Sequence, residues 1–147
     1  MKIISHRGNI EGPGSSVENH PDQIKKVLEM GFDVEIDVWF LNSKWFLGHD
    51  GPENEIDIQF LFKSSLWCHA KNIESMFEMS KYSCIHSFWH QNDDVTLTSR
   101  GYMWTYPGKP LTKSSICVMP ETVSTYTSFD CYGICTDLPV FYKEMLM

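Results

Sequence analysis

Glu35 and Asp37 indicate chemistry most clearly, because the two carboxylates lie two residues apart within an apolar segment. Alternate residues of a β-strand face the same side, so both acids would share one face, opposite Val34, Ile36 and Val38. Paired carboxylates provide the oxygen ligands that Mg²⁺ and Ca²⁺ prefer. The pair therefore predicts a site for a divalent cation, although ion pairs with neighbouring cations would satisfy the same acids equally well.

Arg7 and Lys71 are the cations that could form those ion pairs, or could instead bind an anionic substrate. Two histidines, His6 and His49, follow short apolar segments and could act as general base and general acid, because imidazole titrates near neutral pH. Taken singly, each histidine is better explained as a hydrogen-bonded or exposed side chain without a catalytic role.

A second kind of metal site is also conceivable from the spacing of histidines. His86 and His90, together with His69, could bind zinc, but their spacing suits a helix and residues 85–88 are typical of a strand. The cysteines are odd in number and show no zinc-ribbon spacing, so we interpret all five as reduced thiols: Cys68, Cys84, Cys117, Cys131 and Cys135.

Short apolar segments alternate with helical patterns along the whole chain. Strands are expected at residues 3–6, 32–40, 66–71, 83–88, 101–106, 116–119 and 132–136, with a hairpin arm over 44–48. A loop is expected at residues 12–15. Helices are expected after Pro21, around Ile58 and Ile73, over 138–147, and as a short helical turn over 93–99.

This alternation predicts an α/β fold in which parallel strands are covered by helices. We expect a reduced TIM-type (β/α) barrel of about seven to eight short parallel strands with short helices, since such barrels usually need about 250 residues. An open doubly wound sheet is the alternative. In either fold, the polar residues at the carboxyl ends of the strands would gather at one rim.

The 147 residues correspond to a single domain, residues 1–147, and the net charge is −7. The acidic balance argues against non-specific nucleic-acid binding, which needs basic patches. The chain begins without an apolar leader and contains no segment long enough to span a membrane, so a cytoplasmic location is expected. Short helices would leave apolar surface uncovered, which makes a homodimer plausible.

Four motifs together resemble one known family. Ser5-His6-Arg7-Gly8, Glu18-Asn19, Glu35-Ile36-Asp37-Val38 and Leu47-Gly48-His49-Asp50 are similar, in order and spacing, to the signature of the glycerophosphodiester phosphodiesterases. Weaker similarities continue through Ala70-Lys71, Ser87-Phe88, Trp104-Thr105 and the segment from Gly133 to Pro139. The resemblance implies a TIM barrel that binds one divalent metal, Mg²⁺ or Ca²⁺, and cleaves a small glycerol-type phosphodiester.

The same resemblance implies a role for each matching residue. His6 and His49 would be the acid–base pair, Glu35 and Asp37 would bind the metal, and substrate would contact Arg7, Lys71 and Trp104. The residues expected to support the site are Glu18, Asn19 and Asp50.

The sequence departs from the family where the third metal ligand, usually a glutamate, is replaced by His69. In a strand His69 would share a face with Lys71, so it could still reach the metal, and its nitrogen would favour Mn²⁺ or Zn²⁺. This departure and the short loops leave a second hypothesis open, in which the chain is a non-catalytic module that binds phosphate or a polyol.

Overall fold

A computed structural model describes residues 1–14, 16–124, 126 and 128–147, so Ser15, the last residue of the predicted loop over 12–15, lies outside it. The strands are β1 (Lys2–His6), β2 (Asp33–Leu41), β3 (Lys44–Leu47), β4 (Asn54–Ile56), β5 (Leu66–Ala70), β6 (Ser87–Phe88), β7 (Val95–Leu97), β8 (Met103–Thr105), β9 (Ser115–Val118) and β10 (Gly133–Thr136). The described helices are α1 (Pro21–Glu29), α2 (Ile73–Ser80) and α3 (Pro139–Met145), with short 3-10 helices η1 (Ile58–Phe62) and η2 (Pro120–Thr122).

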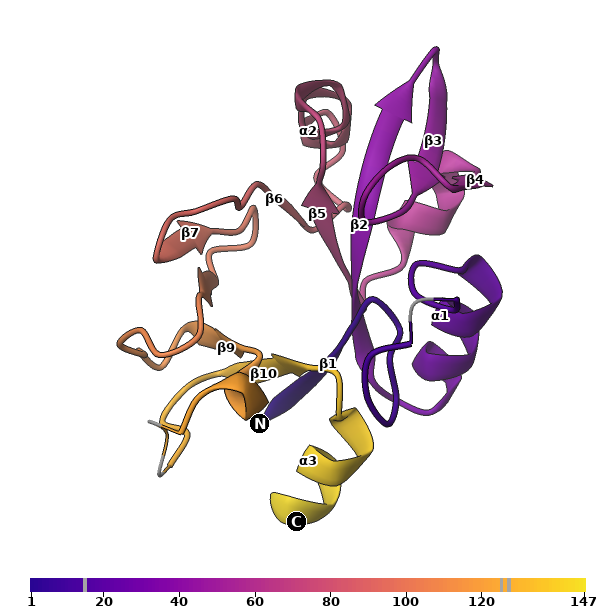
Figure 1. The fold of residues 1–147 in the computed structure, drawn as a ribbon. Helices are drawn as coiled ribbons and strands as arrows, with labels where there is room; N and C mark the ends of the chain where they lie inside the picture. The colour runs from indigo at the N-terminus through magenta and orange to yellow at the C-terminus, as the bar shows by residue number, and fades with distance from the viewer. Residues whose placement is uncertain (15, 125, 127) are drawn as a thin grey trace.

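All ten strands belong to one mixed sheet. Seven of them run parallel in the order β6-β5-β2-β1-β10-β9-β8. The predicted hairpin is formed by β2 and β3 and is extended by β4, while β7 pairs antiparallel with β8. Figure 1 shows the sheet curling into a half-barrel, with α1, α2 and α3 on its outside.

The predicted reduced TIM-type barrel is therefore wrong, and so is the alternative of a doubly wound sheet. Within the described residues only three short α-helices accompany the sheet, and the links that join β6 to β8 and β8 to β9 contain none. The first link is occupied by the edge strand β7, and the second is short and carries Pro107 and Pro110, which disfavour a helix. The helical turn predicted over 93–99 is also wrong, because Val95–Leu97 forms β7 on the edge of the sheet.

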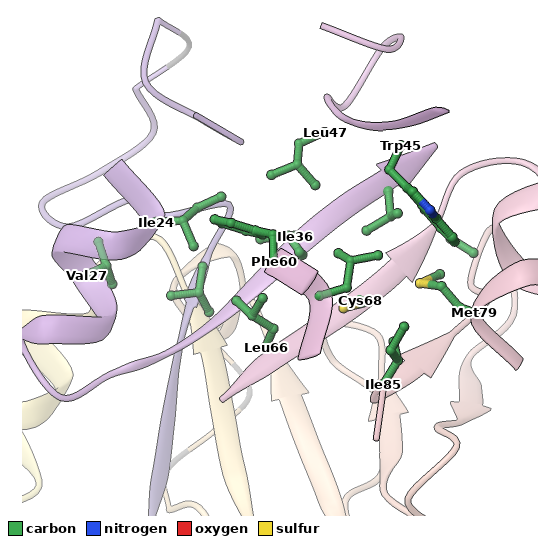
Figure 2. Close-up of a cluster of buried hydrophobic side chains, with 14 of the residues drawn as sticks. Ile24, Val27, Ile36, Trp45, Leu47, Phe60, Leu66, Cys68, Met79 and Ile85 are labelled. Atoms are coloured by element: carbon green, nitrogen blue, oxygen red, sulfur yellow. The ribbon is translucent and has the colours of Figure 1, made fainter. Parts of the chain in front are cut away.

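The alternation along β2 separates a core face from a polar face, as the sequence predicts. Val34, Ile36 and Val38 are fully buried and belong to the largest hydrophobic cluster, which fills the space between the sheet and the outer helices. Figure 2 shows Ile36 in this cluster beside Phe60 of η1, with Met79 of α2 farther along the cluster, beyond Cys68. Because successive residues of a strand face opposite sides, Glu35 and Asp37 point to the inside of the curl.

A second hydrophobic cluster forms the floor on the inside of the curl. Its members come from six of the parallel strands: Ile4, Trp67, Phe88, Trp104, Ile116, Val118 and Cys135. Parallel strands present their carboxyl ends at the same edge, so the residues that end β1, β2, β5, β8, β9 and β10 gather above this floor.

Local sequence explains where the helices begin. The side chain of His20 accepts a hydrogen bond from the backbone N–H of Asp22 at 3.3 Å, and Pro21 occupies the first turn of α1. Asn72 caps α2 by accepting a hydrogen bond from the Ser75 N–H at 3.1 Å.

Three further predictions concern the surface and the thiols. All five cysteines, each among the described residues, are free thiols. No helix in the described part of the chain has the length and apolar character needed to cross a bilayer. Large apolar side chains are exposed on α2 and α3, including Ile73, Phe77 and Phe141, which is the uncovered surface that the homodimer hypothesis requires.

Candidate active site

His6 ends β1 with its ring held between two carboxylates. Its Nδ1 lies 2.9 Å from Oδ1 of Asp137, which follows β10, and its Nε2 lies 4.0 Å from Oε2 of Glu35. A carboxylate only accepts, so Nδ1 carries the proton. Burial alone would lower the pKa of His6, but the hydrogen bond to Asp137 and the charge of Glu35 outweigh it and raise that pKa. The surroundings therefore favour the imidazolium form of His6.

Asn9 links the His6–Asp137 pair to another carboxylate, that of Glu18. Its side-chain amide donates to Oδ1 of Asp137 at 2.7 Å and to Oε1 of Glu18 at 2.9 Å, while its oxygen accepts from the Gly14 N–H at 3.1 Å. Asn9 is buried, and its amide gives Glu18 Oε1 a partner and adds a second hydrogen bond to the Asp137 oxygen that His6 contacts. The sequence interpretation missed this residue, although it stands only three positions after His6.

Arg7 and Asn19 fix the loop between β1 and α1. Both have left-handed backbones with φ of 56°, and the Asn19 N–H donates to the Arg7 carbonyl at 3.0 Å. The Asn19 amide donates to Oδ2 of Asp37 at 2.9 Å, and its oxygen accepts from the Asp37 N–H at 2.9 Å. Asn19 therefore lies where the supporting role predicted for it requires.

Glu35, Asp37 and His69 form a group that could hold a metal ion. One ligand atom from each lies within 4.8 Å of the others, because β2 and β5 pair with Asp37 opposite His69. The His69 Nε2 donates to the carbonyl of His90 at 2.8 Å, which turns Nδ1 toward the carboxylates, 3.3 Å from Asp37 Oδ1 and 3.6 Å from Glu35 Oε1.

Two oxygens in this group are buried without a hydrogen bond. They are Oε2 of Glu35 and Oδ1 of Asp37, each with no partner of adequate geometry among the described residues. Buried carboxylate oxygens without partners are costly unless a cation compensates them. Two carboxylates, each with one such oxygen, and one imidazole nitrogen together fit a divalent cation.

The charges of the group support one another in the metal-free chain. Burial would raise the pKa of Asp37, but contacts with His49 and His69 and the charge of Arg7 hold it well below its usual value. Burial would lower the pKa of His69, whereas its contacts with Asp37 and Glu35 raise it to about 9. A protonated His69 therefore compensates the two carboxylates when no metal does.

His49 is placed by the turn after β3. The Gly48 N–H donates to the Asp37 carbonyl at 3.1 Å, and the Trp39 indole donates to the Gly48 carbonyl at 2.7 Å. A Cβ on Gly48 would collide with the Gly51 carbonyl oxygen, so only glycine fits immediately before His49.

The ring of His49 lies between a cation and an anion. Its Nε2 lies 3.3 Å from Nη2 of Arg7, and its Nδ1 lies 3.4 Å from Oδ2 of Asp37. A guanidinium only donates hydrogen bonds, so Nε2 is the acceptor in its contact with Arg7. The two histidines thus have different neighbours: His49 contacts a guanidinium as well as a carboxylate, whereas His6 lies between two carboxylates.

These groups open onto a cavity of about 420 Å³, a volume within the range of small-molecule sites. Trp104 lines it, braced by Phe88 at a ring distance of 4.5 Å, and Lys71 lines it with Nζ 3.8 Å from Asp37 Oδ1. The other predicted residues in its lining are His6, Arg7, Glu35, His49 and His69.

Some predicted residues play a different part. Asp50 has a side chain that is 94 % exposed, so its 3.7 Å approach to His49 makes it a surface neighbour. Glu18, by contrast, lies within the β1–α1 loop and is hydrogen-bonded to Arg7 at 3.4 Å and to Asn9 at 2.9 Å, contacts of the supporting kind that was predicted for it. The zinc hypothesis is wrong, because the Nε2 of His86 lies 2.7 Å from Oγ1 of Thr98 and His86 joins no metal-ligating group among the described residues.

Besides Asn9, the sequence interpretation missed Tyr106 and Met119, which line the cavity just after β8 and β9, and Gln91, which lines it after β6. Their only sequence signal is position at a strand end, because none belongs to a recognisable motif. His90, considered only as a zinc ligand, lines the cavity beside Gln91.

A larger cavity, about 880 Å³, opens near the amino ends of the strands and is lined by Lys2, Lys113, Lys143 and Asp130 among others. It contains no histidine and no paired carboxylates, so the chemistry favours the smaller cavity.

Comparisons with family models, curated proteins and solved structures found no match to this chain.

Proposed function

We propose that the chain is a metal-dependent phosphodiesterase that uses His6 and His49 as its acid–base pair. The observation that carries this proposal is one juxtaposition: a group able to hold a divalent cation lies between two imidazoles, of which His6 pairs with a carboxylate and His49 contacts a guanidinium. General acid–base hydrolysis of a phosphodiester uses one group that accepts a proton and one that donates a proton, together with positive charge beside the phosphate.

Glu35, Asp37 and His69 would hold the metal, and the mixed donor set suits Mn²⁺ or Zn²⁺ as well as Mg²⁺. When bound, a divalent ion would neutralise charge on the phosphate and polarise its oxygens. Arg7 and Lys71 line the same cavity and would bind the phosphate oxygens.

The two histidines would divide the proton transfers. His49 would act as the general base, because it lines the cavity beside Arg7, on the side that would bind the phosphate. His6 donates to Asp137 and faces Glu35, and both carboxylates stabilise an imidazolium that can protonate the leaving alkoxide. Asp137 also orients the ring, and Asn9 holds Asp137 in place.

This assignment uses the residues through which the sequence resembles the glycerophosphodiester phosphodiesterases. It does not rely on the barrel of that family, which this chain does not form.

The second hypothesis is a non-catalytic module that binds phosphate. One observation favours it: Asp37 already lies within 3.8 Å of cationic nitrogens from Arg7, His69 and Lys71, so its charge is compensated without a metal. Such a module would be stabilised against heat by a phosphodiester and would not turn it over.

The test compares two diesters that differ in their need for a general acid. Bis(p-nitrophenyl) phosphate releases a weakly basic phenolate, whereas benzyl methyl phosphate releases a basic alkoxide that must be protonated. With Mn²⁺, Mg²⁺ or Ca²⁺ present, we expect His49→Ala to slow both reactions by at least about 100-fold. We expect His6→Ala to slow the benzyl diester by a similar factor and the nitrophenyl diester much less.

His20→Asn is the matched control, because His20 is exposed and lies outside the cavity, and asparagine can still cap α1. It should leave both rates unchanged. Wild-type rates at background with all three cations, or equal losses in His20→Asn and His49→Ala, would refute the enzyme hypothesis.

A further inference from the structure

The cavity has two chemically different sides. The cationic side comes from the ends of β1, β2 and β5 and from the turn after β3. The opposite side, here called the apolar wall, follows the ends of β8 and β9 and consists of Trp104, Tyr106, Pro107, Val118 and Met119. A phosphodiester held by the cationic side would direct one of its ester groups toward this wall.

The aromatic residues of the apolar wall are held in fixed positions. Trp104 packs against Phe88 at a ring distance of 4.5 Å, and Tyr106 packs against His90 at 3.8 Å. The Tyr106 hydroxyl donates to the carbonyl of Gln91, so it is already engaged. A wall that is preformed in this way loses little conformational freedom when a ligand binds.

Met119 has an unusual backbone for its residue type. Its φ is 46°, a left-handed conformation that an unbranched apolar residue rarely adopts. The conformation is maintained by hydrogen bonds from the Met119 N–H to the Cys135 carbonyl at 2.7 Å and from the Thr122 hydroxyl to the Met119 carbonyl at 2.7 Å. This backbone sets a flexible apolar side chain at the edge of the cavity, against the inner cluster.

The apolar wall offers little to a polyol. Pro107, Val118 and Met119 have no polar side-chain group that could pair with a hydroxyl, and the Tyr106 hydroxyl already donates its proton to the Gln91 carbonyl. Hydroxyls of a glycerol group placed against Pro107, Val118 and Met119 would lose their water partners without replacement, which is unfavourable. A flat apolar group would instead gain the burial and aromatic contact that the wall provides.

Resting on the proposed phosphodiesterase activity, we propose that the apolar wall selects a small diester in which one ester group is aromatic or apolar, in preference to a diester of glycerol. Met119 and Trp104 are then specificity-determining residues. The volume of about 420 Å³ suits a small molecule of this kind.

The test compares benzyl methyl phosphate with 2,3-dihydroxypropyl methyl phosphate, whose leaving alcohols are both alkyl alcohols, by following the products with ³¹P NMR in the presence of Mn²⁺. We expect kcat/KM to be at least about tenfold higher for the benzyl diester, because one aromatic ring is buried in its transition state. Equal values, or a preference for the glycerol diester, would overturn the inference and leave the phosphodiesterase activity standing.

The variant Met119→Asn makes the apolar wall polar without disturbing the backbone, since asparagine tolerates a positive φ. We expect it to reduce the benzyl preference severalfold. The control is Met30→Asn, at a methionine that is 38 % exposed and lies outside the cavity. A preference that Met119→Asn leaves intact, or that Met30→Asn reduces equally, would overturn the role of the wall.

Binding of the monoesters separates this inference from the enzyme hypothesis. We expect calorimetry to give tighter binding of benzyl phosphate than of glycerol phosphate, with Met119→Asn narrowing the difference. If benzyl phosphate binds more tightly but no diester is hydrolysed, the enzyme hypothesis is refuted and the selective role of the apolar wall is supported. If the two monoesters bind equally tightly, the selective role of the apolar wall is refuted, whether or not diesters are hydrolysed.

Discussion

Replacing His86 by glutamine tests how burial controls ionisation beneath the site. His86 is 2 % exposed, packs on Trp67 at a ring distance of 4.2 Å, and pairs with the Thr98 hydroxyl at 2.7 Å. Burial, helped by the charge of Arg100, lowers the pKa of His86 from 6.5 to about 4. The folded chain therefore holds this ring neutral at pH values where the unfolded chain protonates it.

The sign follows from proton linkage. Between pH 6.5 and pH 4 the unfolded state binds the extra proton, so the stability of the wild type falls as the pH falls through this range. From pH 7.5 to pH 5 the contribution of His86 amounts to a loss of about 2 kcal/mol, or roughly 4–8 °C in Tm.

The assay is urea unfolding of wild type and His86→Gln at both pH values. Glutamine does not titrate and can still pair with Thr98, so between pH 7.5 and pH 5 the free energy of unfolding of His86→Gln should fall by about 2 kcal/mol less than that of the wild type. If the free energy of unfolding falls equally in the two proteins, burial does not depress the pKa of His86.

Two further substitutions and the removal of metal by a chelator test the candidate site itself. Gly48→Ala should lower the rate of diester hydrolysis by at least about tenfold, because a Cβ at this position would displace His49. Gly51→Ala should leave the rate unchanged, because a Cβ on Gly51 meets nothing within 4 Å. Equal rate losses in the two variants would contradict this prediction. Asp137→Asn should move the alkaline limb of the pH–rate profile to lower pH, since His6 loses the partner that raises its pKa; an unmoved limb would exclude His6 as the general acid. Stripping metal with a chelator should lower Tm, and Mn²⁺ should restore it in a concentration-dependent way; a Tm that ignores both would contradict metal binding.

The parts that the sequence predicts correctly depend on local pattern. The two-residue period of β2 sends Glu35 and Asp37 to one face and Ile36 to the core, and it can be read without knowledge of any other strand. The same period puts His69 on the face of its strand that bears Lys71. The approximate positions of the parallel strands can likewise be predicted from the apolar segments, because these are also a local pattern.

The parts that could not be predicted depend on distant partners. Val95–Leu97 becomes a strand because β8 pairs with it, and no local pattern distinguishes that outcome from a helical turn. Asn9 matters because it meets Asp137, 128 positions later. The strand–helix alternation suggested a closed barrel, but the described connections after β6 form an edge strand and loops in place of helices, and the sheet is an open curl.

The central claim is that Glu35, with Asp37 and His69, holds a divalent cation on which diester hydrolysis depends. Its most direct test is the rate of bis(p-nitrophenyl) phosphate hydrolysis by metal-stripped protein as Mn²⁺ is added. The control is Glu55→Gln, because Glu55 is an exposed glutamate paired with Lys44. We predict that Mn²⁺ activates hydrolysis saturably in wild type and Glu55→Gln, and that Glu35→Gln needs at least a tenfold higher Mn²⁺ concentration for half-maximal activation. A rate that does not depend on Mn²⁺, or a Glu35→Gln response identical to that of wild type, would contradict the account.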